Sequence, residues 1–259
     1  MPLRGKRAIV TGAAAGIGRA IAERLARAGC TLTLIDRAGD AVEGAAGALR
    51  ARGVEARALV LDMAELEAVE PAIRRAAQVM GGLEILVNNA GIAVQKPFLE
   101  HGLGDFERIY RVNLFALFAA SRAAAAWMVE HRVPGRIVNI ASVAGLRGST
   151  GRSAYGSSKA AVINLTQVAA QELAPFGITV NAIAPGPIET DLVKVMHTER
   201  TRAGWLREVP MGRYGEPADV AEAVAYLVSD GAGYVTGHVL CVDGGFAGAG
   251  LLIPVEDLS

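Results

Sequence analysis

A chain of 259 residues with 26 basic and 26 acidic side chains has no formal net charge and is long enough for one large α/β domain or two small ones. The balance gives no bulk electrostatic reason to expect nucleic acid or an anionic membrane surface as a partner. Cys30 and Cys241 lack His or Cys neighbours at metal-ligand spacing. We therefore expect two reduced thiols in a cytoplasmic protein and no metal site.

The N-terminal segment superficially matches a secretory signal, since Arg4, Lys6 and Arg7 precede an apolar stretch with small residues. Thr11 and several glycines interrupt that stretch, and the charged residues of an amphipathic helix follow at once. No run of about 18 apolar residues appears further along the sequence. We expect neither a signal peptide nor a membrane span.

A glycine-rich turn, Gly12-Ala13-Ala14-Ala15-Gly16-Ile17-Gly18, joins a predicted strand at 7–10 to a predicted helix at 17–28. Glycines let the backbone approach an anion closely, and a helix N-terminus offers unpaired N–H groups and the positive end of the helix dipole. The spacing differs from the general dinucleotide fingerprint G-x-G-x-x-G. Taken alone, the turn fits a phosphate cradle or a plain tight turn about equally well.

Asp36 ends the second predicted strand, at 31–35. An acidic residue about 20 positions beyond the glycine turn is placed to bind the ribose hydroxyls of an adenine dinucleotide. The alternative is a helix N-cap or a solvated turn carboxylate.

The apolar pattern continues to alternate between strands and helices, which implies a parallel sheet with helices on both faces. Further helices are predicted near 40–52, 65–80, 105–130, 154–173 and 217–229, and further strands at 58–61, 83–87, 138–142 and 238–242. We find no repeat, low-complexity segment or linker. The sequence therefore predicts one α/β domain over residues 1–259, with a doubly wound parallel sheet of about seven strands.

Asparagines interrupt this regular pattern at two places. Asn88-Asn89-Ala90-Gly91 follows the fourth predicted strand, and Asn113 lies inside the predicted helix at 105–130. Asn is a poor mid-helix residue because its side chain competes for backbone groups. Asn113 predicts a local distortion or a polar partner, with an exposed helical Asn as the alternative.

Ser142, Tyr155 and Lys159 place a hydroxyl, a phenol and an amine at spacings that suit proton transfer at an alcohol oxygen. Tyr155 and Lys159 are four apart at the start of a predicted helix, so their Cβ atoms lie about 5–6 Å apart on one face. A phenol with a pKa of about 10 is a poor base at neutral pH unless a nearby ammonium favours its phenolate. Taken alone, such a pair is more often a surface pair, so the other motifs decide.

The assembled motifs resemble the classical short-chain dehydrogenases/reductases over nearly the whole chain. The match comprises Thr11-Gly12-x-x-x-Gly16-x-Gly18, Asn88-Asn89-Ala90-Gly91, Asn113, Ser142, Tyr155-x-x-x-Lys159, Pro185-Gly186 and Val242-Asp243-Gly244-Gly245. These motifs occur in the family's order, and the glycine spacing is the family's own. The resemblance implies a Rossmann-type fold and hydride transfer between a nicotinamide cofactor and a secondary alcohol or ketone.

The resemblance also implies a role for each matching residue. Tyr155 is expected to be the catalytic acid/base and Ser142 to orient the substrate oxygen. Lys159 is expected to lower the pKa of Tyr155 and to bind the nicotinamide ribose, and Asn113 to hold a water that links Lys159 to solvent. The expected cofactor contacts are Gly12, Gly16, Ile17, Gly18, Asp36, Asp62, Asn89, Ala90, Gly91, Tyr155, Lys159, Pro185, Gly186, Ile188 and Thr190.

The expected cofactor is NAD rather than NADP. Asp36 would accept hydrogen bonds from both ribose hydroxyls and repel a 2′-phosphate. Ala14 and Ala15 leave the glycine turn without the basic residue that a phosphate contact would need. Arg37 is the counter-argument, since its cation is adjacent to Asp36.

Residues of about 189–212 break the alternation of strands and helices, at a place where the resemblance implies a substrate lid. Leu192, Val193, Met196 and Trp205 are expected to close an apolar pocket, with Arg200, Arg202 and Arg207 on the solvent side. The alternative is that the apolar residues only dock the segment on the core. Of the four histidines, His197 is the one that falls in this lid.

Three readings of function remain: an oxidoreductase, a non-catalytic dinucleotide-binding sensor, and an enzyme subunit of a larger assembly. A pure sensor has no need of a tuned phenol. Among enzymes the runner-up is a 3-oxoacyl-(acyl-carrier-protein) reductase, which usually prefers the phosphorylated cofactor and is therefore disfavoured by Asp36.

We expect a homotetramer in which the long helices containing Asn113 and Tyr155 pack against their symmetry mates. The run Ala123-Ala124-Ala125-Ala126 permits close helix approach. The tail beyond Gly245, which contains Phe246, Leu251, Leu252 and Ile253, is expected to dock on a neighbouring subunit.

Overall fold

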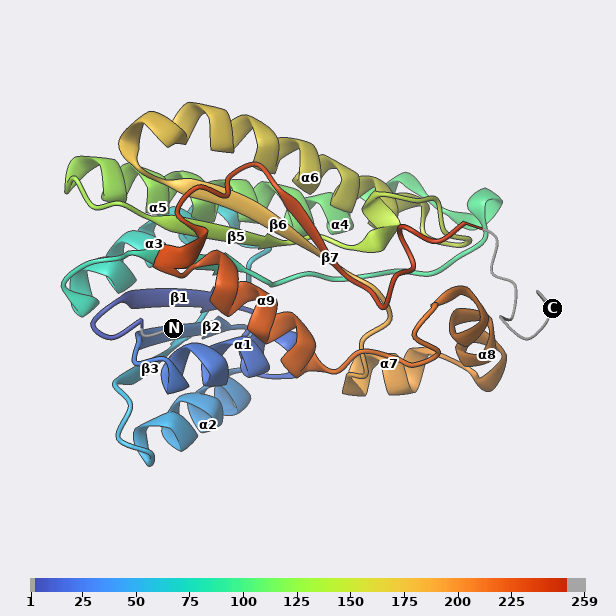
Figure 1. The fold of residues 1–259 in the computed structure, drawn as a ribbon, viewed down its shortest axis with the longest axis horizontal. Coiled ribbons are helices and arrows are strands. Elements are labelled where there is room, and N and C mark those ends of the chain that lie inside the picture. Colours follow the sequence, from blue (N-terminus) through green and yellow to red (C-terminus); the bar gives the residue numbers. More distant parts are fainter. Residues whose placement is uncertain (1–2, 251–259) are drawn as a thin grey trace.

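The computed structural model describes residues 3–250, which build a seven-stranded parallel sheet with helices on both faces (Figure 1). The strands are β1 (Arg7–Thr11), β2 (Thr31–Asp36), β3 (Ala56–Val60), β4 (Ile85–Asn88), β5 (Arg136–Ile140), β6 (Thr179–Pro185) and β7 (Val239–Val242). Their order in the sheet is β3-β2-β1-β4-β5-β6-β7. The chain therefore winds outward in both directions from the β1–β4 pair, which confirms the predicted doubly wound fold.

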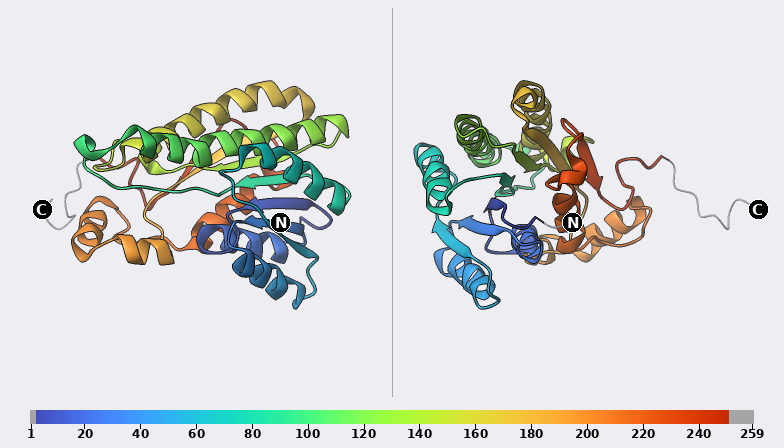
Figure 2. Two further views of the ribbon diagram at one scale, coloured as in Figure 1. Left: turned by 180° about the vertical axis from the view of Figure 1, so that it is seen from behind. Right: turned by 60° about the vertical axis from the view of Figure 1, so that its left-hand side comes forward.

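Two layers of helices enclose the sheet. The helices are α1 (Gly16–Arg27), α2 (Gly39–Arg50), α3 (Leu66–Met80), α4 (Leu103–Tyr110), α5 (Leu117–Glu130), α6 (Ser153–Leu173), α7 (Asp191–Met196), α8 (Glu199–Glu208) and α9 (Pro217–Leu227). The first layer contains α1, α2 and α9, and the second contains α3, α5 and α6, of which the last two run side by side (Figures 1 and 2). The short helices α7 and α8 lie outside both layers, at the carboxyl ends of the strands.

Alternate strand residues serve two separate cores. Val10 and Leu34 pack toward α1, α2 and α9, whereas Ile9 and Ile35 pack toward α3 and α5. Successive side chains of a strand point to opposite faces, so a strand buried on both faces has to be apolar throughout. This requirement explains the continuous apolar runs in the sequence.

Buried amides connect the centre of the sheet to the second helix layer. The amide of Asn88 donates to Ser121 Oγ (2.8 Å) and to Asn139 Oδ1 (2.9 Å), and the amide of Asn139 donates to Thr166 Oγ1 (2.9 Å). Buried polar groups are costly unless they are paired, so these bonds favour one position of α5 and α6 on the sheet. The first Asn of the Asn88-Asn89-Ala90-Gly91 motif thus has a structural role.

The sequence left two regions without assigned elements. Strand β6 contains the polar Asn181 and ends at Pro185, which breaks the apolar pattern even though all seven of its residues are buried. The predicted lid contains helices α7 and α8, which begin at the N-caps Thr190 and Thr198. Each cap hydroxyl accepts a backbone N–H within the first turn of its helix.

The predicted helix at 105–130 is present but is not uniform. A π-helical segment, η2 (Arg111–Ala116), separates α4 from α5 and contains Asn113. This is the distortion that a mid-helix Asn predicted. Together these elements form one continuous helical stretch, Leu103–Glu130, which is long and apolar enough by composition to cross a membrane. Core helices of soluble proteins pass the same test, and the inner face of this stretch packs on the sheet.

The alanine run on α5 requires a correction. Ala123, Ala124 and Ala125 are buried against the chain's own sheet and α3, so they are not the surface offered to a symmetry mate. In η2 and α5, the large apolar side chains that are exposed are Phe115 and Phe118. The predicted tail contact falls on Leu251, Leu252 and Ile253, which lie outside the described residues.

Candidate active site

A cleft of about 430 Å³ lies at the carboxyl ends of the strands, where β1 and β4 diverge. It brings together most of the residues that the sequence predicts. These are Gly12, Gly16, Ile17, Asp36, Asn89, Ala90, Gly91, Ser142, Tyr155, Lys159, Pro185, Gly186, Ile188 and Thr190. The predicted residues that do not line it are Gly18, Asp62 and Asn113, and each of these three has a different place in the structure.

The glycine turn is shaped by close backbone contacts. A Cβ atom on Gly12 would lie 2.9 Å from the Cα of Ala90, and one on Gly18 would lie 2.0 Å from the carbonyl oxygen of Gly12. Gly12 and Gly16 also have positive φ angles of 63° and 54°. Gly18 therefore supports the turn from beneath and does not face the cleft.

The N-terminus of α1 suits an anion. Its N-cap, Ala15, has no side chain that can accept from the N–H groups of the first turn. These N–H groups begin at the cleft wall, where Gly16 and Ile17 are lining residues. Unpaired N–H groups and the helix dipole fit the pyrophosphate of a dinucleotide cofactor.

Asn89 fixes the turn to the neighbouring strand. Its amide donates to the carbonyl oxygens of Thr11 and Gly12, both at 3.0 Å. In the opposite direction, the backbone N–H groups of Asn89 and Ala90 donate to Thr11 Oγ1 at 3.0 Å. The side chain of Asn89 thus holds the two turns together at the cleft floor, which the motif alone did not predict.

The two acidic residues at the strand ends differ in position. Asp36 lies at the rim of the cleft, where its carboxylate accepts from Ala14 N and Ala38 N, both at 3.1 Å. A carboxylate has about four acceptor positions, so lone pairs remain for ribose hydroxyls. Asp62 accepts from Ala64 N (2.9 Å) and stabilises the turn after β3 without lining the cleft.

Direct backbone contact brings the Ser142 loop against α6. A Cβ atom on Gly145 would lie 2.7 Å from the carbonyl carbon of Lys159, and one on Gly156 would lie 2.9 Å from the oxygen of Ala144. Ser142 caps the short helix η3 (Val143–Gly145) by accepting from Ala144 N at 3.1 Å. The two glycines therefore allow Ser142 and Tyr155 to face the same cleft.

Lys159 is buried at this contact, and Tyr155 is partly buried. Lys159 Nζ donates to the carbonyl oxygen of Ile140 (2.7 Å) and lies 5.8 Å from the centroid of the Tyr155 ring. Burial lowers the pKa of Lys159 to about 8. Burial also raises the pKa of Tyr155 above its ordinary value, while hydrogen bonding with Ser142 and the charge of Arg152 oppose that rise. The net direction is opposite to the lowering by Lys159 that we expected, because desolvation of the phenolate outweighs the favourable contacts.

Asn113 lies behind the cleft and is completely buried. Its Oδ1 accepts from Ile92 N (2.8 Å), and its Nδ2 donates to the oxygen of Ile92 (3.0 Å) and to Ser158 Oγ (3.1 Å). It thus has the polar partners that were one of the two predicted outcomes. By joining the segment around Ile92 to α6, it holds one cleft wall beside Tyr155 and Lys159. Its role in binding water stays a prediction.

A smaller pocket of about 150 Å³ extends from Ser142 and Tyr155 under the lid. Val193, Met196 and Trp205 line it as expected, whereas the side chain of Leu192 is outside the described part of the structure. His197 also lines this pocket, and its Nδ1 lies 3.0 Å from the hydroxyl of Tyr214.

Polar and aromatic contacts fix the conformation of the segment that is predicted to be a lid. Arg202, expected on the solvent side, instead makes a bidentate pair with Glu189 at 2.7 and 2.8 Å. The Trp205 ring lies 5.0 Å from that of Phe246. Phe246 also packs under Arg147 of its own chain. Phe246, which we expected to contact a neighbouring subunit, therefore packs against Trp205 of its own chain.

Ser149 and Arg152 line the same pocket but were not predicted. They fall in an irregular segment, where no periodic pattern indicates the direction of a side chain. Their only signal in the sequence is their position just before Tyr155-x-x-x-Lys159.

Known proteins are similar to this chain in sequence and in overall fold. Residues 12–247 match a family model described as enoyl-(acyl carrier protein) reductase. The chain is 40% identical over 244 residues to the 3-oxoacyl-(acyl-carrier-protein) reductase FabG of Aquifex aeolicus, covering 94% of this chain and 98% of the relative.

Solved structures agree with this similarity. A short-chain type dehydrogenase/reductase from Mycobacterium marinum superposes with a TM-score of 0.90 at 35% identity, over 95% and 96% of the two chains. A protein of Beutenbergia cavernae, assigned as an NAD(P)-dependent gluconate 5-dehydrogenase and solved with NADP at low occupancy, has a TM-score of 0.90 at 40% identity, over 96% and 99%.

The lowered pKa of Lys159 predicts a pH-dependent contribution to stability. The side chain titrates near pH 8 in the folded protein but near its ordinary value of 10.5 in the unfolded chain. Between these values the unfolded chain binds more protons, so stability gains with rising pH. We expect the free energy of unfolding of the wild type, minus that of Lys159→Met, to increase from about pH 8 to about pH 10. Urea denaturation at several pH values measures this difference, and a flat profile would contradict the assigned burial.

Proposed function

Because this chain belongs to the classical short-chain dehydrogenases/reductases, we propose that it transfers a hydride between NAD and a secondary alcohol or ketone, with Tyr155 as acid/base. The observation that carries this proposal is the cleft that places Ser142, Tyr155 and Lys159 beside the glycine turn. A bound nicotinamide supplies the hydride chemistry, so the protein has to bind both partners and move one proton. The substrate is a small molecule.

The direction in which the pKa of Tyr155 shifts indicates which form of its side chain is present at neutral pH. Because the pKa of Tyr155 is raised, its phenol is protonated at neutral pH and is ready to donate to the oxygen of a ketone. In the oxidative direction the phenolate has to form first, so activity rises with pH. Ser142 holds the substrate oxygen beside the phenol. Lys159 in its charged form stabilises the phenolate and binds the nicotinamide ribose.

The remaining residues of the cleft would contact different parts of a bound dinucleotide. The first turn of α1 takes the pyrophosphate, and Asp36 takes the adenosine ribose. Asp62 lies next to that ribose site, since β2 and β3 pair side by side up to Asp36 and Val60. Ile188 and Thr190 lie at the other end and take the carboxamide.

A second candidate function is that of a 3-oxoacyl-(acyl-carrier-protein) reductase. Its support is the 40% identity to the enzyme of A. aeolicus over nearly the whole chain. Both candidates use Tyr155 in the same role, so the cofactor and the substrate distinguish them.

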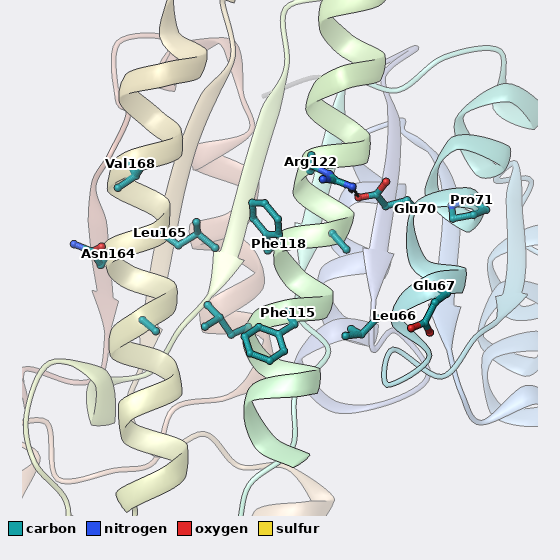
Figure 3. Close-up of a pocket in the computed structure, with 13 residues that line it drawn as sticks. Leu66, Glu67, Glu70, Pro71, Phe115, Phe118, Arg122, Asn164, Leu165 and Val168 are labelled. Carbon is teal, nitrogen blue, oxygen red and sulfur yellow. Dashed lines mark hydrogen bonds and ion pairs between the residues drawn. The ribbon is translucent and has the colours of Figure 1, made fainter. Parts of the chain in front are cut away.

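We also propose a homo-oligomer, most simply a tetramer, located in the cytoplasm. A hollow of about 860 Å³ lies between α3, α5 and α6, on the outer side of the second helix layer (Figure 3). Phe115 and Phe118 project into it with side chains that are about half exposed, and Leu165 faces them from α6. Apolar surface of this kind is typical of subunit interfaces. The two cysteines are free thiols, in keeping with a reducing compartment.

Replacing Tyr155 by Phe tests the acid/base role. General acid–base catalysis contributes about 10²–10⁴ in rate, so we expect kcat to fall at least about a hundredfold while cofactor affinity changes little. Steady-state kinetics and a cofactor titration measure the two effects. Tyr226→Phe, on α9 outside the cleft, is the control and should leave kcat unchanged. Retention of more than about a tenth of the activity, a loss of less than about 1.4 kcal/mol, would exclude the phenol as the proton carrier.

The cofactor preference tests the role of Asp36. We expect NAD to be favoured over NADP at least about tenfold in kcat/KM, because the carboxylate repels a 2′-phosphate. Asp36→Ala should narrow or reverse this ratio, whereas Asp40→Asn, an exposed acidic residue nearby, should not. Preference of the wild type for NADP, as bound in the B. cavernae structure, would refute the ribose role and favour the acyl-carrier-protein reductase.

The oligomer is tested by a charge placed on the apolar face. Phe118→Glu should dissociate the assembly, because its carboxylate would be buried in the interface. Light scattering at micromolar concentration measures the mass. Val79→Glu, on an exposed part of α3 outside the hollow, is the control. A monomeric wild type, or an unchanged mass for Phe118→Glu, would contradict the proposal.

A further inference from the structure

Arg152 lies in the wall of the small pocket under the lid, next to the catalytic phenol. The guanidinium carbon lies 5.5 Å from the centroid of the Tyr155 ring, and the side chain is half-buried. The other walls come from the Ser142 loop and from the lid, including His197 and Trp205. None of the residues that line this pocket is acidic.

The charge of Arg152 has no protein counter-ion within residues 3–250. The neighbouring charged groups of the lid are paired with each other: Glu189 binds Arg202, and Asp191 binds Lys194. A partly desolvated cation is costly unless an anion or a set of acceptors meets it. The pocket wall therefore holds a positive charge whose partner has to come from outside the described chain.

His197 does not add a second charge to this wall. Burial lowers its pKa, and the nearby charge of Arg152 lowers it further, so the imidazole is neutral at pH 7. Among the residues that line the pocket, Arg152 is therefore the cation.

We propose that Arg152 binds the carboxylate of a short-chain hydroxy acid or of the corresponding oxo acid, and so selects anionic substrates. The planar guanidinium presents paired N–H donors that match a carboxylate bidentately. A volume of about 150 Å³ is below the range of roughly 300–1,000 Å³ that drug-sized ligands fill, so the acid is small.

The reaction itself rests on the proposed function, and this inference names its substrate class. Oxidation moves a hydride from the carbinol carbon to the nicotinamide and the hydroxyl proton to the Tyr155 phenolate. The carboxylate keeps its charge and its contact with Arg152 throughout. The contact therefore positions the reacting carbon in both directions.

Matched acids and amides test the role of the charge. We would measure kcat/KM for four-carbon 2-hydroxy and 3-hydroxy acids and for their primary amides, which have the same skeleton without the charge. The wild type should prefer one acid to its amide at least about tenfold, which corresponds to about 1.4 kcal/mol. Arg152→Gln should remove this preference and Arg152→Lys should keep part of it. Arg207→Gln, an exposed arginine of the lid, is the control.

The ratio of kcat/KM for an acid to kcat/KM for its amide reports only on binding of the carboxylate. Arg152 also acts on the pKa of Tyr155, but that effect changes both substrates alike and cancels in the ratio. An acid-to-amide ratio near one for every pair in the wild type, or the same ratio in Arg152→Gln as in the wild type, would overturn the proposal.

A binding measurement separates this inference from the proposed function. Trp205 lines the pocket, so its fluorescence should report binding of the hydroxy acid to the NAD-loaded Tyr155→Phe variant, with no response to the amide. Adding Arg152→Gln should weaken this binding at least about tenfold. Acid binding through Arg152 without turnover of any substrate by the wild type would support the anion site and refute the oxidoreductase. Turnover of neutral alcohols with no preference for acids would support the oxidoreductase and refute the anion site.

Discussion

The close approach of two backbone turns, one after β1 and one after β4, is the contact on which the site depends. Gly12 lies so near Ala90 that no side chain fits between them, and Thr11 and Asn89 join the same turns through four hydrogen bonds of 3.0 Å. Helices leave these neighbouring strands on opposite faces of the sheet, so their ends diverge just beyond this contact. The cleft is the space that results, and the N-terminus of α1 opens onto it because the glycine turn is so tight.

The positions of the proposed catalytic groups depend on a second contact, between the Ser142 loop and α6. The buried amides of Asn88 and Asn139 position α6 from the sheet, and Gly145 and Gly156 let the loop touch it. Such tight packing reduces the contact of Tyr155 and Lys159 with water, which raises the pKa of Tyr155 and lowers that of Lys159. The same burial that fixes the geometry therefore disfavours the charged form of both groups, the phenolate of Tyr155 and the ammonium of Lys159. The charges that lie around the reacting oxygen then determine when the proton is transferred.

Much of this architecture could be predicted from the sequence, because it depends on short-range patterns. Strand and helix periodicity gave the layers, and fixed spacings gave the glycine turn, Asn113 and the Tyr155–Lys159 pair. Asn113 also predicted the distortion of its helix, because the side chain of an Asn inside a helix competes for backbone hydrogen-bonding groups. The pKa direction of Tyr155 escaped prediction because it depends on how completely other elements cover the phenol. Strand β6 was not predicted because Asn181 and Pro185 interrupt its apolar run, and Arg152 was not predicted because an irregular segment gives no side-chain direction.

The two ends of the cleft differ in local charge even though the whole chain has none. Asp36 presents a carboxylate where the adenosine ribose is proposed to lie, while Arg152 presents a cation beyond the reacting phenol. Charges in a partly buried cleft are screened less than those on the open surface, where interactions fade over about 8 Å at physiological salt. We therefore propose that each end selects its own ligand: Asp36 would disfavour an extra phosphate, and Arg152 would favour an anionic substrate. A net charge of zero for the whole chain is therefore compatible with electrostatic selection of ligands. Such selection depends on single charged side chains that have no counter-ion in the described part of the protein.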